Sequence, residues 1–229
     1  MINIIQSYII MEEEKKANGS FEDLDLNEKL LRGIYSYGFE IPSAIQSKAV
    51  PFLKSKKDII AQAQSGTGKT GAFVIGSLER IDVSVKGTQV IIISPTRELA
   101  KQTTEVVDEL GKYMGVTSLE VVGGTDVFKC RSDLDKLPQI IIGTPGRILD
   151  MIEKKSIFTD KLVSLIFDEA DEILSFGFKE TIYNIVKCIP EQCQICLFSA
   201  TIPDEVLEMT ASFMNSPESI LVKKEQLTL

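Results

Sequence analysis

Eight consecutive residues carry the clearest chemical signal in this chain, namely Ala63, Gln64, Ser65, Gly66, Thr67, Gly68, Lys69 and Thr70. Glycines at 66 and 68 permit backbone conformations closed to other residues, so successive N–H groups can converge on an anion at the start of a helix. Lys69 can place its charge beside the β and γ phosphates of a nucleotide, and Thr70 can ligate the accompanying Mg²⁺. The general pattern begins with glycine rather than Ala63, and an ordinary strand-to-helix turn is the alternative. The run predicts a phosphate loop if a strand precedes it and a helix follows.

A pair of carboxylates forms the second chemical cluster. Asp168 and Glu169 follow the apolar run Leu165-Ile166-Phe167. Asp168 can hold Mg²⁺ directly or through water, while Glu169 can orient and deprotonate the water that attacks a γ-phosphoryl group. A solvated acidic turn is the alternative for this pair in isolation. Beside a phosphate loop, the pair predicts an ATPase with Lys69, Asp168 and Glu169 as catalytic residues.

Composition removes several other classes of site. The 229 residues include no histidine and carry a net charge of -8, which excludes histidine-based catalysis or metal binding and argues against gripping nucleic acid by bulk electrostatics. No stretch approaches the ~20 apolar residues of a membrane span. Cys193 and Cys196 fall in a predicted strand, where residues three apart face opposite sides and cannot share a metal ion. We expect Cys130, Cys188, Cys193 and Cys196 to be reduced thiols of an intracellular protein.

The elements that must position these groups alternate regularly along the chain. Apolar β-rich runs predict strands at 58–62, 89–94, 118–122, 139–143, 162–168, 194–199 and 219–222, and helices include 27–37, 43–53, 96–113, 144–153, 178–188 and 203–214. This alternation is typical of an α/β fold with a parallel sheet, and the continuously apolar strands should be covered on both faces. Because ligands gather at the carboxyl ends of such strands, the polar segments there predict one extended functional edge.

On these motifs, the chain resembles the DEAD-box RNA helicases. The family is named after the one-letter sequence DEAD, which residues 168–171 match. The resemblance implies a RecA-like parallel β-sheet flanked by helices, a P-loop NTPase fold, over residues 21–222. The segment from Gly38 to Gln46, with Phe21 upstream, looks like the family's adenine-reading element at 21–47. It implies that Gln46 hydrogen-bonds the adenine edge, that Phe21 packs nearby, and that Phe39 and Ile41 belong to the ATP site. Without the family, Phe21 and Gln46 would be a core aromatic and a surface amide.

Three further segments resemble the family's RNA-backbone contacts, namely Pro95, Thr96 and Arg97; Gly123 and Gly124; and Thr144, Pro145, Gly146 and Arg147. Hydroxyls, glycine amides, helix N-termini and arginines suit phosphate oxygens and do not read bases, so the expected binding is sequence-independent. Separately, each segment could be a helix cap or a turn. Ser199 and Thr201 resemble the motif that couples nucleotide state to RNA, with Asp171 as their expected hydrogen-bond partner. They could also cap the helix starting at Pro203, alone or together with the coupling role.

The resemblance also sets the expected domain organisation. We expect a flexible leader at 1–20, a RecA-like ATP-binding domain at 21–222, and the start of an interdomain linker at 223–229. Met1 and Met11 are alternative native starts. The family's second RecA-like domain supplies arginines to the γ-phosphate and lies beyond Leu229. The 229 residues should therefore be the amino-terminal half of a longer enzyme, binding ATP with little turnover by themselves.

Within the family, the chain most resembles the translation initiation factor four-A group, including its nuclear exon-junction relative. The implied cofactors are ATP and Mg²⁺, and the implied partners are single-stranded or duplex RNA, the second RecA-like domain, and scaffold proteins of translation initiation or mRNA processing. The expected location is cytoplasmic, with a nuclear one as the alternative. Two other functions are alternatives to the helicase. The chain could be a small-molecule phosphotransferase, or a module that docks protein partners and binds nucleotide only for regulation. Phe176 departs from the group and predicts either a partner surface or core packing.

Overall fold

The computed structural model describes residues 19–222. Most of the predicted leader and all of the predicted linker therefore lie outside the described residues. The described chain forms a seven-stranded sheet in the order β3-β4-β2-β5-β6-β1-β7, and every neighbouring pair is parallel. The strands are β1 (Ile59–Ala63), β2 (Val90–Ile93), β3 (Ser118–Val121), β4 (Ile140–Gly143), β5 (Ser164–Asp168), β6 (Gln194–Ser199) and β7 (Glu218–Val222). The expected parallel α/β sheet is confirmed.

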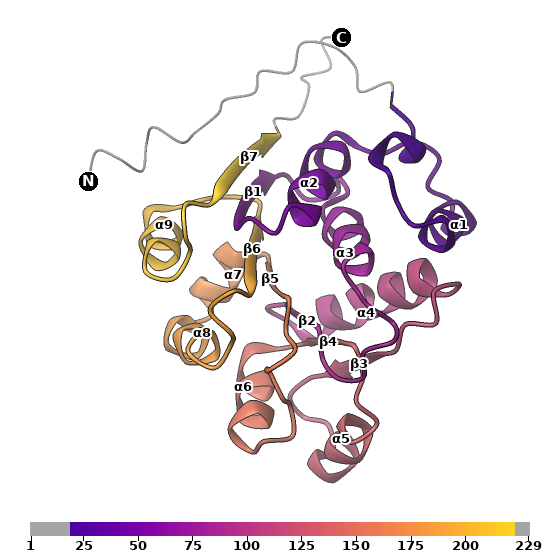
Figure 1. The fold of residues 1–229 in the computed structure, drawn as a ribbon. Helices are drawn as coiled ribbons and strands as arrows, with labels where there is room; N and C mark the ends of the chain where they lie inside the picture. Colours follow the sequence, from indigo (N-terminus) through magenta and orange to yellow (C-terminus); the bar gives the residue numbers. More distant parts are fainter. Residues whose placement is uncertain (1–18, 223–229) are drawn as a thin grey trace.

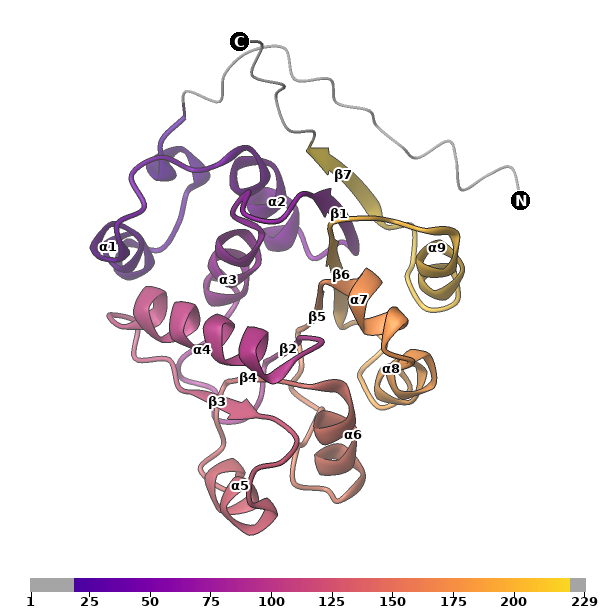
Figure 2. The same cartoon turned by 180° about the vertical axis from the view of Figure 1, so that it is seen from behind.

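Helices cover both faces of the sheet (Figures 1 and 2). On one face lie η2 (Phe21–Leu24), α1 (Glu28–Tyr37), α2 (Ala44–Lys54), α3 (Lys69–Glu79) and α4 (Arg97–Gly111). On the other lie α5 (Val127–Leu134), α6 (Pro145–Glu153), α7 (Ala170–Ser175), α8 (Lys179–Val186) and α9 (Asp204–Ala211). Alternate residues of each central strand point into the two layers, and Ile91 and Ile92 are both fully buried. Burial on both faces explains the continuously apolar strands.

Local sequence sets where several helices begin. The Ser43 hydroxyl accepts a hydrogen bond from the Gln46 amide at the start of α2, and Thr96 does the same for the Leu99 amide at the start of α4. These caps satisfy N–H groups that have no partner within the helix. Thr144 stands at the N-cap of α6 with Pro145 in the first turn, as predicted, but its hydroxyl does not cap that helix. The hydroxyl instead accepts a hydrogen bond from the Gly123 amide.

The structure resolves several alternatives from the sequence. Cys193 packs in the α5–α9 layer and Cys196 in the α1–α4 layer, so the two thiols lie on opposite faces as predicted. Phe176 is 56% exposed, which rules out core packing for that residue. The short helices α5 and α7 were not specified from the sequence, because neither offers enough residues for a clear helical period. Within residues 19–222, no helix is both long and apolar enough to cross a membrane.

Candidate functional site

The predicted phosphate loop has the structural context that it requires. β1 ends at Ala63 and α3 begins at Lys69, so the loop runs from a buried strand into a helix N-terminus. Gly68 holds the N-cap in a left-handed conformation with φ of 94°, which an L side chain adopts only with strain. The Thr67 hydroxyl donates to the Gln64 carbonyl at 2.6 Å and fixes the loop internally. The backbone N–H groups at the start of α3 are therefore presented together, as an anion requires.

Gln46 holds the predicted adenine-reading element against this loop. Its side-chain oxygen accepts from the Ser43 amide at 2.9 Å, and its side-chain nitrogen donates to the Gly68 carbonyl at 3.3 Å. A Cβ at Gly68 would lie 2.9 Å from that nitrogen, so glycine is also needed for the close approach. A primary amide has two donors and two lone pairs. Gln46 thus retains one of each for a ligand, while the two bonds that it makes set its orientation.

The aromatic residues of that element are arranged in a stack. Phe21 is fully buried and stacks on Phe39 with 6.4 Å between ring centroids, and Tyr37 meets Phe39 edge-on at 4.9 Å. Ile41 is 68% exposed. Tyr37 borders the cleft beside the phosphate loop, whereas Phe21, Phe39 and Ile41 are not among the described residues that line it. Sequence reasoning missed Tyr37, whose position directly before Gly38 is the only signal for it.

A cleft of about 510 Å³ lies over the phosphate loop. It brings together the loop, both predicted carboxylates and one wall of α4, and its lining comprises Tyr37, Ser65, Gly66, Gly68, Lys69, Thr70, Leu99, Gln102, Thr103, Glu105, Val106, Asp168 and Glu169. Lys69 is nearly buried there, and its ammonium group donates to the Ala63 carbonyl at 2.8 Å. Ala63, Gln64 and Thr67 belong to the loop but not to the cleft lining. The α4 wall was not predicted from the sequence.

Asp168 is the most perturbed carboxyl group of the cleft. It is 4% exposed, and burial raises its pKa to about 7, with a further rise from the charge of Glu169 and a counteracting effect of Lys69. Burial opposes ionisation because it removes the charged form from water. Hydroxyl and carboxylate oxygens are the donors that Mg²⁺ prefers. The Thr70 hydroxyl and the Asp168 carboxylate therefore fit a magnesium ion, whose charge would favour the ionised form of Asp168.

Glu169 is positioned by the backbone at the start of α7. It stands at the N-cap with φ of 51°, in the left-handed region that few non-glycine residues adopt. Burial, followed by the charge of Glu172 and a hydrogen bond with it, raises the pKa of the Glu169 carboxyl. A carboxylate with a raised pKa is a stronger base at neutral pH. Glu172, which sequence reasoning missed, thus adjusts the residue predicted to activate water.

The predicted partnership of Asp171 with Ser199 and Thr201 is present. The Thr201 hydroxyl and amide donate to one Asp171 carboxylate oxygen at 2.6 and 3.1 Å, and the Asp171 amide donates to the Ser199 hydroxyl at 3.2 Å. Burial alone would raise the pKa of Asp171, but hydrogen bonds from Ser199 and Thr201 outweigh it and lower the pKa. Helix α9 has Pro203 at its N-cap and receives no side-chain cap. The alternative that Ser199 and Thr201 cap α9 is therefore wrong.

The predicted RNA-contact residues gather at the carboxyl ends of β3, β4 and β2, which are adjacent in the sheet. The Thr144 hydroxyl accepts from the Gly123 amide at 3.2 Å and joins two of these segments. Arg147 donates to the hydroxyl and the carbonyl of Thr125, both at 3.1 Å. Gly124 has φ of 80°, and a Cβ there would overlap the Arg97 guanidinium. Pro95 and Pro145 are buried and Gly146 is exposed. We name the Arg97, Gly123–Thr125, Thr144 and Arg147 group the arginine cluster.

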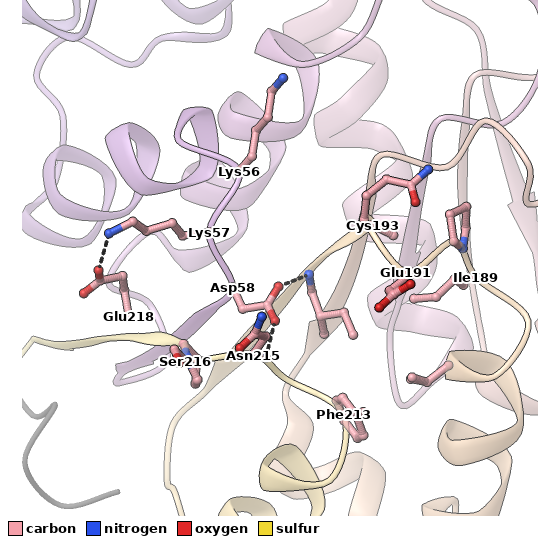
Figure 3. Close-up of a pocket in the computed structure, with 15 residues that line it drawn as sticks. Lys56, Lys57, Asp58, Ile189, Glu191, Cys193, Phe213, Asn215, Ser216 and Glu218 are labelled. Atoms are coloured by element: carbon pink, nitrogen blue, oxygen red, sulfur yellow. Dashed lines mark hydrogen bonds and ion pairs between the residues drawn. The ribbon is translucent and has the colours of Figure 1, made fainter. Parts of the chain in front are cut away.

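A second cavity, of about 770 Å³, lies at the amino ends of the strands, opposite to the carboxyl ends that form the cleft (Figure 3). Three of its charged side chains, those of Lys57, Asp58 and Glu218, are engaged within the protein. The Asp58 carboxylate accepts from the Ile195 and Asn215 amides, each at 2.8 Å, and Lys57 pairs with Glu218 at 2.7 Å. These contacts join the amino ends of β1, β6 and β7. The cavity lies away from the phosphate loop and marks a structural junction.

The fold and the cleft together define a phosphate-loop nucleotide-binding domain of the RecA-like class. The DEAD/DEAH box helicase model matches residues 43–210, and the chain belongs to this family. It is 52% identical over 213 residues to the ATP-dependent RNA helicase eIF4A of Candida albicans, covering 91% of this chain and 53% of that protein. For the eIF4A of Aspergillus fumigatus the identity is 51% over 211 residues, covering 92% and 52%. The chain spans about half the length of these curated relatives.

Solved structures agree with the fold. A DEAD box protein from the hyperthermophile Methanococcus jannaschii has a TM-score of 0.84 and 35% identity, and the match covers 89% of this chain and 56% of that one. Saccharomyces cerevisiae Dbp5 bound to RNA and ADP BeF3 has a TM-score of 0.81 and 35% identity, covering 89% and 52%. The RecA-like sheet predicted from the sequence is thus confirmed.

Proposed function

We propose that this chain is the ATP-binding half of an ATP-dependent RNA helicase, which binds the RNA backbone without sequence preference and couples ATP to unwinding or clamping. One observation carries the proposal. The phosphate-loop cleft and the arginine cluster lie at carboxyl ends of strands in one sheet, and β2 lies between β4 and β5 to connect them. A nucleotide in the cleft and an RNA backbone on the arginine cluster would therefore lie along the same edge of the sheet, formed by the carboxyl ends of its strands. The eIF4A relatives, named as ATP-dependent RNA helicases, support the same function.

Each group of residues in and beside the cleft has its own role in phosphoryl transfer. The amides of the phosphate loop and Lys69 hold the phosphates, while Gln46 presents its remaining donor and acceptor to the adenine edge. Glu169 orients the attacking water and accepts its proton, helped by its raised pKa. Thr70 and Asp168 would hold Mg²⁺, which neutralises the developing phosphate charge when bound.

The Asp171 network would transmit the nucleotide state. Asp171 lies two positions after Glu169, and its hydrogen bonds with Ser199 and Thr201 connect the chain after β5 to the chain at the end of β6. A shift of Glu169 on nucleotide binding would therefore move the loop after β6. We propose that this connection links ATP binding to the RNA-contact edge.

The proposed whole protein contains a second RecA-like domain that closes over ATP and RNA. An arginine supplied by such a partner is worth ~10³ to 10⁵ in rate, so residues 1–229 alone should bind adenine nucleotide with little turnover. We propose a cytoplasmic role in translation initiation or mRNA processing, with scaffold proteins of those processes as partners. The eIF4A relatives support this role over an unrelated one.

The test is an ATPase assay of the full-length protein with and without single-stranded RNA. We expect RNA to stimulate hydrolysis, and both Lys69→Ala and Glu169→Gln to abolish it. Lys161→Ala, which removes an exposed lysine of the opposite edge, is the matched control and should retain full activity. Indifference to RNA together with stimulation by a small acceptor would favour a phosphotransferase. Nucleotide binding without hydrolysis, in the presence or absence of RNA, would favour a docking module in which the nucleotide is only regulatory.

A further inference from the structure

Phe128 is the most exposed of the large apolar side chains in the described part of the chain, at 83%. It lies in the first turn of α5, and the Asp126 carboxylate accepts from its amide at 2.7 Å and from the Lys129 amide at 3.1 Å. This cap fixes the backbone of the turn. The ring therefore projects from a well-defined position even though very little of it is packed.

The position of Phe128 relative to the arginine cluster follows from chain connectivity. Phe128 lies three positions after Thr125, which limits the distance between their Cα atoms to about 11 Å. Thr125 in turn holds the Arg147 guanidinium through two hydrogen bonds. Thr125 thus connects the predicted phosphate contact of Arg147 to the turn that carries the Phe128 ring.

The local chemistry suits a nucleic acid. Although the whole chain has a net charge of -8, three cations lie close in sequence or by contact to this segment: Arg97 lies against Gly124, Arg147 bonds Thr125, and the exposed Lys129 follows Phe128. A cationic track with an exposed aromatic ring beside it is the usual arrangement for single-stranded nucleic acid, because each base offers a face for stacking. The remaining predicted contacts in the arginine cluster suit phosphate oxygens only.

We propose that Phe128 is a stacking site for a nucleobase of the bound RNA. The inference rests on the proposed RNA-binding function and adds a base contact to it. Stacking does not depend on hydrogen-bonding edges, so the contact would accept any base and leave binding independent of sequence. It would strengthen binding at one nucleotide position and hold that base out of a duplex.

The test compares RNA affinities of the full-length protein, measured with Mg²⁺ and a non-hydrolysable ATP analogue. The probes are a fluorescent oligouridylate and an oligomer of equal length with abasic positions. Phe128→Ala should weaken oligouridylate binding roughly 5- to 140-fold, as expected for the loss of one stacked base, and should not weaken abasic binding. Phe128→Trp should bind oligouridylate at least as well as the wild type. Phe158→Ala, which removes a 58% exposed ring from the loop before β5, is the control and should change neither affinity.

Salt dependence separates this site from the phosphate contacts. Phe128→Ala should leave the slope of log Kd against log salt unchanged, whereas Arg147→Ala should reduce it by about 1. Equal oligouridylate binding by Phe128→Ala and the wild type would overturn the stacking site alone. Equal loss on both probes would also overturn it. Absence of RNA binding by the wild type would overturn the proposed function together with this site.

Discussion

Replacing Asp168 with asparagine should stabilise the nucleotide-free protein at neutral pH. Asp168 is 4% exposed, and burial raises the pKa of its carboxyl from the ordinary value of 3.8 to about 7. One pH unit of pKa difference corresponds to about 1.4 kcal/mol. Ionising this group in the folded protein therefore lowers the free energy of unfolding by about 4 kcal/mol, and asparagine has nothing to ionise.

The direction of the pH dependence follows from proton binding. In the unfolded chain Asp168 loses its proton near pH 3.8, whereas in the folded protein it keeps the proton up to about pH 7. Between these values the folded state binds more protons, so its stability falls as the pH rises. The advantage of Asp168→Asn should accordingly be small at pH 4, grow through pH 5 and 6, and level off above pH 7.

Urea unfolding from pH 4 to pH 8, with EDTA and without nucleotide, measures this difference. Asp160→Asn replaces an exposed carboxylate before β5 and should follow the wild type throughout. If Asp168→Asn is less stable than the wild type at pH 7.5, or if the difference between them does not vary with pH, then burial does not raise the pKa of Asp168 as inferred.

Two further predictions concern polar groups that follow the carboxyl ends of the strands. The Ser94 hydroxyl is fully buried and has no hydrogen-bond partner within the described residues, so Ser94→Ala should raise the free energy of unfolding by about 1 kcal/mol; a lower melting temperature would instead reveal a bound water. Asp171→Asn and Thr201→Val should be strongly coupled because the Thr201 hydroxyl donates to the Asp171 carboxylate. A double-mutant cycle in urea should give a coupling of about 1.5 to 3 kcal/mol, and simple additivity would contradict the contact.

Sequence reasoning predicted the features that depend on neighbouring residues. The alternation of apolar runs predicted every strand of the described sheet to within two residues, and the glycines and Lys69 predicted the phosphate loop with its strand and helix. The pairing of Asp171 with Thr201 was expected from the family resemblance rather than from either residue alone, and the structure supplies its geometry.

Features that depend on tertiary packing were not predictable in this way. Gln102 and Thr103 border the cleft because α4 packs beside α3, and nothing in the sequence around them indicates a ligand. The Thr144 hydroxyl occupies a capping position but bonds the Gly123 amide of another loop. Local preferences identify where a helix starts, whereas the partner of a side chain depends on which loops the sheet order brings together.

The two hydrogen bonds between Arg147 and Thr125 have an entropic consequence. A solvated arginine samples many rotamers, and immobilising such a side chain on binding costs about 0.5–1.5 kcal/mol. Arg147 is already oriented before any ligand arrives, because its guanidinium is held at two nitrogens. A guanidinium has five N–H groups, so some remain for a ligand beyond those that bond Thr125 and Cys130. Much of the ordering cost is thus met during folding, which leaves the charge preorganised for an incoming phosphate.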